Sequence, residues 1–140
     1  MALYNKINQF TEDLAKKVHN LSSDVLMIAL TTQAAHPVAT NTVLANITQI
    51  TYTNLSARTL SITSCVQTGG VLKLILADLV LTASGAVAPF GGICLYNSTP
   101  TGTPNQPLIS WWEYGSDVTL ANTETFTIDF DQAAGVLTIT

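Results

Sequence analysis

Charged residues are scarce in this chain of 140 residues: they make up 10% of it, against about 25% of a typical soluble domain. Only five residues are lysine or arginine, and just Arg58 and Lys73 lie beyond residue 17. Too few cations remain to neutralise a phosphate backbone, which argues against nucleic acid as a partner. The Thr, Asn, Ser and Gln that replace them cost less to desolvate than ions. Such a surface is consistent with burial against other protein and, equally, with a neutral β surface.

Long hydrophobic runs are also missing. The longest are Val25–Leu30 and Leu74–Ala77, far short of the roughly 20 residues that a membrane-spanning helix needs. We therefore expect no membrane segment. The opening residues, Met1–Lys6, lack the basic-then-apolar order of a secretory signal.

Cysteine and histidine each occur only twice. Cys65 and Cys94 lie in strand-like runs, which favours two buried thiols, although a disulfide remains open. Two distant cysteines and two distant histidines are too few ligands for a metal centre, so no metal or other cofactor is expected. We place His19 near the end of a helix, where a protonated ring would interact favourably with the helix dipole, and His36 in a solvated loop.

No motif of an enzyme stands out. Ser84 lacks the flanking glycine of a nucleophile elbow, and the glycine pairs at 69–70 and 91–92 lack the lysine and spacing of a phosphate loop. Glu113 and Asp117 are close enough in sequence to suggest a carboxylate pair, but they flank a turn signal and are better interpreted as solvated turn residues. The sequence therefore predicts a protein that is not an enzyme.

The first twenty residues predict an amphipathic helix, because apolar residues recur there at spacings of three and four. These residues are Leu3, Ile7, Phe10, Leu14, Val18 and Leu21. We expect the helix to run from about residue 3 to about residue 19 and to stop at Asn20. Its stripe is compatible with a lid on the chain's own sheet and, equally, with an attachment arm or trimer element.

Short strands are expected from residue 24 onward. Residues 24–31 are apolar on both faces, which predicts a central strand covered on both sides. The runs 57–67 and 71–81 flank Gly69-Gly70 and predict a hairpin. Residues 42–52 fit a short helix or a strand. The two segments that we expect to be exposed loops are 32–41 and 98–106.

The C-terminal part carries the clearest strand signals. Residues 124–130 alternate apolar and polar side chains, and a turn signal at 131–135 separates them from the run 136–140. We therefore expect these two runs to pair as a hairpin.

Trp111 and Trp112 are adjacent in a further expected strand, opened by Pro107, and must point to opposite faces. One can fill the core, whereas the other needs a second layer, a neighbouring subunit or a ligand. Aromatic residues dominate the energetics of protein interfaces, so we place Tyr114 and the outward-facing tryptophan at a subunit contact. The full set of interface candidates is Leu3, Ile7, Phe10, Trp111, Trp112 and Tyr114.

These elements predict a mainly β fold: an antiparallel β-sandwich or barrel of seven to eight short strands with one N-terminal amphipathic α-helix. The length fits one domain, 1–140, with the helix in 1–20 and the β part in 24–140.

Several short segments resemble a family of small virion structural proteins of tailed bacteriophages. They are Leu3–Lys6, Glu12–Ala15, Val18–Leu21, Leu95–Asn97, Trp111–Gly115 and Thr125–Phe130. The resemblance covers most of the chain and is weakest in the loops 32–41 and 98–106. Its motifs are structural, so it implies assembly rather than a reaction and carries over no site residue.

Within that family, the chain is most similar to a capsid decoration, or cement, protein. The resemblance implies a homo-oligomer, most often a trimer, that is made in the host cytoplasm. It would bind the major capsid protein on the capsid exterior and tie capsomers together. A tail, fibre or head–tail connector component is the alternative within the class. A carbohydrate-binding β-sandwich module, with Trp111, Trp112 and Tyr114 as stacking platforms, is the alternative outside it.

Overall fold

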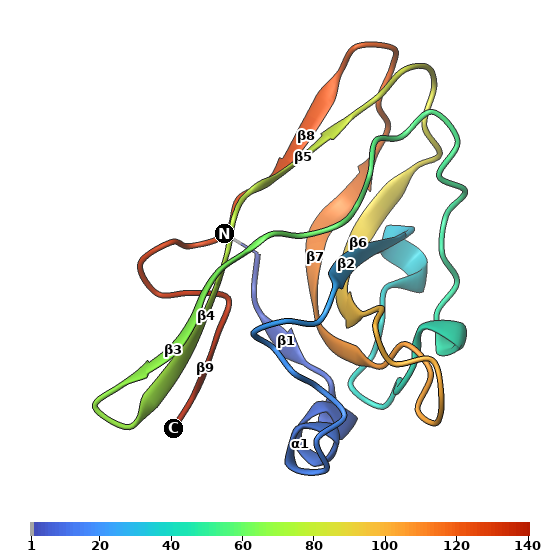
Figure 1. Cartoon of the computed structure of the whole chain (residues 1–140). Coiled ribbons are helices and arrows are strands. Elements are labelled where there is room, and N and C mark those ends of the chain that lie inside the picture. The colour runs from blue at the N-terminus through green and yellow to red at the C-terminus, as the bar shows by residue number, and fades with distance from the viewer. Residues whose placement is uncertain (1) are drawn as a thin grey trace.

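A computed structural model describes residues 2–140 of the chain (Figure 1). It is mainly β, with antiparallel sheets and one N-terminal helix, which confirms the predicted fold class. The elements are β1 (Asn5–Lys6), α1 (Asn8–Ala15), β2 (Leu26–Thr31), β3 (Ile62–Thr68), β4 (Val71–Leu76), β5 (Leu79–Thr82), β6 (Phe90–Asn97), β7 (Leu108–Val118), β8 (Thr125–Ile128) and β9 (Leu137–Ile139). Short 3₁₀ turns lie at Gln33–Ala35 and Leu44–Asn46.

The body of the molecule is a four-stranded sheet in the order β1-β7-β6-β2. All eight residues of β6 are buried, and Cys94 in β6 pairs with Trp111 of β7 on one side and Ala29 of β2 on the other. The central strand of the body is therefore β6.

The prediction that residues 24–31 form a central strand is wrong in position, although β2 is buried as expected. β2 ends the sheet order, and irregular segments cover its outer edge. Leu60 N donates a hydrogen bond to Leu26 O at 2.9 Å, and Ile50 N donates to Leu30 O at 2.9 Å. A strand that is apolar on both faces is expected to be buried, but the pattern does not show what buries it. Loops can cover an edge strand as completely as neighbouring strands can.

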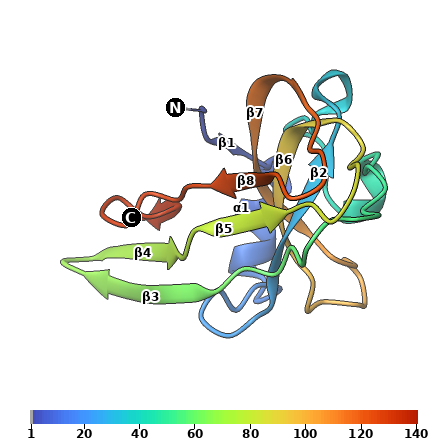
Figure 2. The ribbon, with the colours of Figure 1, turned by 90° about the horizontal axis from the view of Figure 1, so that it is seen from above.

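A second sheet, with the order β3-β4-β9, projects from the body (Figures 1 and 2). We call this sheet the arm. The predicted hairpin around Gly69-Gly70 is confirmed, since Val71 pairs with Thr68 and both glycines have left-handed φ values of 61° and 86°. Glycine adopts such values without steric cost, which is why this pair makes the turn.

The predicted hairpin between 124–130 and 136–140 is wrong. β8 pairs with β5, and β9 pairs with β4. The turn signal makes a local loop instead, because Asp131 Oδ1 accepts hydrogen bonds from Ala133 N at 2.8 Å and Ala134 N at 2.7 Å. Asp78, at the expected break between β4 and β5, accepts from Phe130 N at 2.9 Å. β8 and β9 therefore pair with two consecutive parts of one long bent segment, β5 and β4.

The helix is shorter than predicted. It spans Asn8–Ala15, and Lys17 follows it with a left-handed φ of 63°. The segment before it is extended, since Asn5 pairs with Trp111 in β7. The apolar residues spaced three or four apart lie in a strand, a helix and a turn in succession. Periodicity alone cannot distinguish this arrangement from one continuous helix. No helix among residues 2–140 is long and apolar enough to cross a membrane.

Candidate protein-contact surface

The structure buries half of the predicted interface residues in the chain's own core. Ile7 is 0% exposed, Phe10 4% and Trp111 7%. Ile7 N also donates to Ile109 O of β7 at 3.0 Å, and α1 packs against β7. The N-terminal stripe thus acts as a lid on its own sheet, and these three side chains present no contact surface in this conformation.

Trp112 points to the opposite face from Trp111, as expected. Its second layer comes from the chain itself: its ring makes T-shaped contacts with Tyr4, at a centroid distance of 5.7 Å, and with Phe130, at 6.1 Å. Trp112 is only partly buried and packs against the core cluster. An intramolecular layer, one of the three partners that the sequence left open for this ring, is therefore present.

Leu3 and Tyr114 are the predicted interface residues that remain exposed, at 76% and 56%. The Tyr114 ring is held at one edge by Phe126, with centroids 5.5 Å apart, and Phe126 packs in turn on Phe90 at 5.2 Å. Tyr114 therefore offers a positioned aromatic ring in the second half of β7.

The structure also contains a cleft between the arm and α1, which the sequence did not predict. One hollow of about 610 Å³ lies between Tyr4, Phe10 and residues 134–140. A second, of about 420 Å³, lies between residues 17–22 and the arm residues Cys65 and Leu72. The two hollows meet at Leu14 and Ile139, and we call them together the arm cleft.

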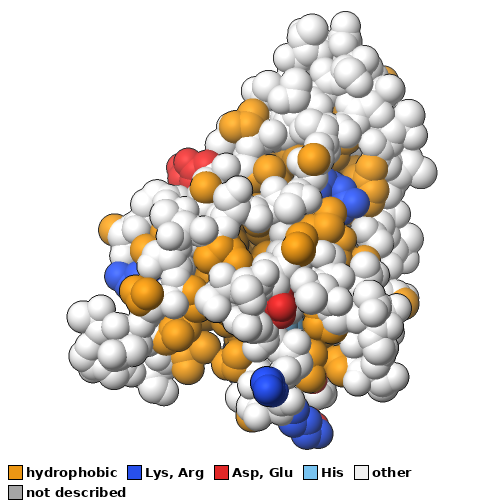
Figure 3. Space-filling view, in the orientation of Figure 1, with side chains coloured by type: hydrophobic (Ala, Val, Ile, Leu, Met, Phe, Trp, Pro, Cys, Tyr) orange, Lys and Arg blue, Asp and Glu red, His pale blue; other side chains and the backbone are white. Residues whose placement is uncertain are grey.

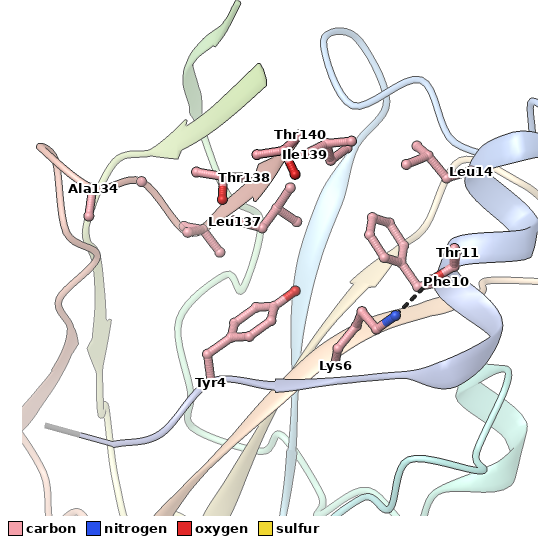
Figure 4. Close-up of a pocket in the computed structure, with 12 residues that line it drawn as sticks. Tyr4, Lys6, Phe10, Thr11, Leu14, Ala134, Leu137, Thr138, Ile139 and Thr140 are labelled. Atoms are coloured by element: carbon pink, nitrogen blue, oxygen red, sulfur yellow. Dashed lines mark hydrogen bonds between the residues drawn. The ribbon is translucent and has the colours of Figure 1, made fainter. Parts of the chain in front are cut away.

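The walls of the arm cleft are mostly apolar. In Figure 4, Tyr4 and Phe10 face the strand that carries Leu137 and Ile139, and Figure 3 shows hydrophobic side chains gathered between the arm and α1. Leu14 is the cleft residue that the sequence singled out, as a member of the helical stripe. In the structure it is only partly buried. Its position against an open gap depends on where the arm lies, which the local pattern does not report.

A buried polar cluster lies beside the arm cleft. His19 is 6% exposed, and Asn97 Nδ2 lies 3.1 Å from His19 Nδ1 and 2.6 Å from Asp24 Oδ2. Because Nδ2 is a donor, His19 Nδ1 accepts and the proton sits on Nε2, which has no partner within residues 2–140. The helix ends at Ala15, so the expected helix-dipole role of His19 is wrong, and the ring instead anchors the turn before β2.

Burial lowers the pKa of His19 below its ordinary 6.5, and the nearby carboxylates of Asp13 and Asp24 offset part of that effect. The unfolded chain therefore takes up a proton at a higher pH than the folded chain does. The stabilisation by neutral His19 is complete above pH 6.5 and is lost as the pH falls through the folded pKa.

We expect the free energy of unfolding to decrease as the pH falls below 6.5, by up to about 1.4 kcal/mol per pH unit for this single proton. Urea unfolding at a series of pH values between 7.5 and the onset of carboxylate titration measures the slope. His19→Asn should remove that contribution. An equal slope in the variant would contradict the assignment to His19.

Glu113 and Asp117 are not turn residues as predicted, because β7 continues through them to Val118, with Gly115 at a φ of 99°. Both carboxylates hold Gln33: its N donates to Asp117 Oδ1 at 2.6 Å, and its Nε2 donates to Glu113 Oε2 at 3.1 Å. Gln33 Oε1 accepts from Gly115 N at 2.9 Å. His36 Nε2 lies 3.7 Å from the same Glu113 oxygen, and the His36 side chain is 32% exposed, which makes it partly buried rather than fully solvated as expected. These contacts fasten the loop 32–41 to β7.

Both cysteines are free thiols, Cys94 buried and Cys65 partly buried. Burial raises the pKa of Cys94 to about 12 and also raises that of Cys65, which keeps both protonated and poorly nucleophilic at neutral pH. Within residues 2–140, no group of three or more His, Cys, Asp or Glu is arranged to hold a metal ion.

Comparison with known proteins returns no match to this chain among protein-family models, curated proteins or solved structures. The resemblance to phage virion proteins therefore rests on the sequence segments given above.

Proposed function

We propose that the protein is a structural virion protein that binds the outer surface of a tailed-phage capsid and ties capsomers together as a homo-oligomer, with a trimer as the expected form. The observation that supports this proposal is the arm cleft, an open hollow with largely apolar walls that the chain itself leaves unfilled. Contiguous apolar surface of this kind typically marks a contact with another macromolecule.

The charges around the cleft support a protein partner. Lys6, the lysine in the larger hollow, donates to Thr11 Oγ1 at 2.7 Å. Lys73 on the arm donates to Ala133 O at 2.6 Å. These acceptors are uncharged oxygens and do not compensate the ammonium charges. The support comes instead from how few charged residues line the two hollows, namely Lys6, Lys17 and Asp24. A weakly charged contact loses little free energy to desolvation, which suits a protein that covers a preformed shell.

The decisive test is the position of the protein on purified virions, by cryo-electron microscopy combined with mass spectrometry of the particles. We expect density for it on the outer capsid surface between capsomers. We also expect particles that lack it to release their genome at a lower temperature. Density on the tail or at the head–tail junction would favour the alternative within the class. Absence from finished particles would overturn the proposal.

A carbohydrate-binding module is the second candidate, because Tyr114 offers an exposed aromatic ring. Trp111 is buried and Trp112 is engaged by Tyr4 and Phe130, so one of the three expected stacking platforms is exposed. A glycan array distinguishes the readings: binding that is lost in Tyr114→Ala would support the module.

A further inference from the structure

One edge of the arm is an unprotected β-strand edge. In the order β3-β4-β9, β3 pairs only with β4, so its outer edge has no partner strand within residues 2–140. Its seven residues, Ile62–Thr68, include no charged residue and no proline, and Val66 is 61% exposed. The register shift between Ile62 and Ser64 leaves the outer part regular.

Exposed strand edges readily template pairing with another strand. Proteins usually prevent this with lysines, prolines, bulges or a covering segment. The bulge at the base of β3 is the one such device present, and it does not interrupt Ser64–Thr68. The outer edge of β3 is therefore suited to pair with a strand of another molecule in an assembly.

A matching acceptor lies on the same chain. β9 is the opposite edge of the arm, and among residues 2–140 it pairs only with β4. The wall that contains it lines the larger hollow from Ala134 to Thr140. β9 itself comprises only Leu137–Ile139, because residues 134–136 belong to the preceding loop, in which Gly135 has a left-handed φ of 79°. The strand edge open to an added strand is therefore about 10 Å long.

The charges favour a second copy of the chain as the occupant. β3 and the wall 134–140 both lack charged side chains, and Lys6 in the hollow is bonded to Thr11. Lys6, Lys17 and Asp24 are the charged residues that line the two hollows. Two lysines are too few for nucleic acid, and the mixed signs do not favour a strongly charged peptide. A second copy brings an uncharged strand, β3, that is long enough to cover the whole of the β9 edge and is rich in β-branched residues that favour sheets.

We propose that copies of this chain associate head to tail, with β3 of one copy pairing as an added strand with β9 in the arm cleft of the next. Such a heterologous contact closes into a ring when the rotation between copies permits and otherwise forms a filament. The inference names the surface for the self-association in the proposed function, but it is tested on the purified protein without any virion.

The first test places a charge on the donor edge. Val66→Lys should weaken association by roughly tenfold or more, because an ammonium would be forced into an uncharged interface. Val80→Lys is the matched control, since Val80 is also an exposed strand valine, at 51%, but lies on β5. Sedimentation equilibrium should give an oligomer for the wild type and the control and the chain mass of 14.9 kDa for Val66→Lys. A monomeric wild type, or a Val66→Lys variant of unchanged mass, would overturn the proposal.

The second test is a cysteine pair that can link only between copies. Val66 and Thr138 both pair with Lys73, from opposite sides, so they lie on the same face with β4 between them. Two strand spacings, about 10 Å, separate them within one copy, which is too far for a disulfide. When β3 of one copy is registered so that Val66 lies opposite Thr138 of the next, the two become neighbours on adjacent strands, where a disulfide can form.

In a Cys65→Ser background, mild oxidation of Val66→Cys/Thr138→Cys should give covalent multimers, with a band at three chains if the ring is a trimer. Each single variant should stay unlinked. Dimers of Val66→Cys alone would show that two β3 edges pair with each other, which would overturn the head-to-tail arrangement. Linked multimers of a protein missing from virions would contradict the proposed function while leaving this contact intact.

Discussion

Replacing Trp111 by alanine should lower the free energy of unfolding by about 3–5 kcal/mol, as for other buried tryptophans. The side chain is 7% exposed, and its residue pairs with Asn5 of β1 on one side and with Cys94 of β6 on the other. Removing it would leave a cavity where the N-terminal strand joins the body. Urea unfolding with a two-state analysis measures the loss.

Two matched variants sharpen this test. Trp112→Ala should cost less, because Trp112 is only partly buried. Trp111→Phe should keep much of the stability, since Trp111 Nε1 has no hydrogen-bond partner within residues 2–140 and no bond is lost. The oligomer mass should be unchanged in all three. An altered mass without lost stability would mean that Trp111 belongs to an interface after all.

Replacing Gly92 by alanine should destabilise the body sheet by about 2–3 kcal/mol, near the upper end for overpacking a core. An added Cβ would lie 2.2 Å from Thr31 Oγ1 and 3.1 Å from His36 Cα. Gly92 pairs directly with Thr31 across β6 and β2, and Thr31 is 0% exposed. The new methyl group therefore has no free space to enter.

Gly102→Ala is the control, because a Cβ at Gly102 meets no atom within 4 Å. It should change the stability by less than about 0.5 kcal/mol. Thr31→Ala removes the closest clashing atom, so Gly92→Ala should cost less in that background than alone. A double-mutant cycle in chemical denaturation measures this coupling. Strict additivity of the two changes would contradict the proposed clash.

The structure divides the molecule into a well-packed body and an arm that is only partly supported. β6 and β2 are buried almost throughout, whereas β3 is mostly exposed. Narrow sheets gain stability by packing a face against another layer, and the arm has its open cleft on the side toward α1. Pairing the free edge of β9 with a strand from a neighbouring copy would widen the narrow sheet and fill the cleft, which is the physical basis of the proposed contact.

Several features could be predicted because they depend on residues close together in the sequence. The Gly69-Gly70 hairpin is one, since both glycines have positive φ. The opposite orientation of Trp111 and Trp112 is another, because successive side chains on a strand alternate. The break near Asp78 also falls where the pattern indicated.

The predictions that proved wrong concern strand pairing and other contacts between segments far apart in the sequence. The pairing of β8 with β5 rather than β9 required knowing that β4 and β5 form one long bent partner. The extended start before α1 required the edge of β7 to be free for Asn5. The roles of Glu113 and Asp117 required the loop at Gln33 to reach β7 from 84 residues away.

By itself, the sequence determined the mainly β class, the weakly charged surface and the positions of most strands, because those follow from composition and local periodicity. Only the tertiary structure decided which side chains are covered. Ile7, Phe10 and Trp111 became core, and the arm cleft remained open, through contacts between residues far apart in the chain. Burial is a property of such contacts, so the residues available to a partner emerge only when the strands have been placed.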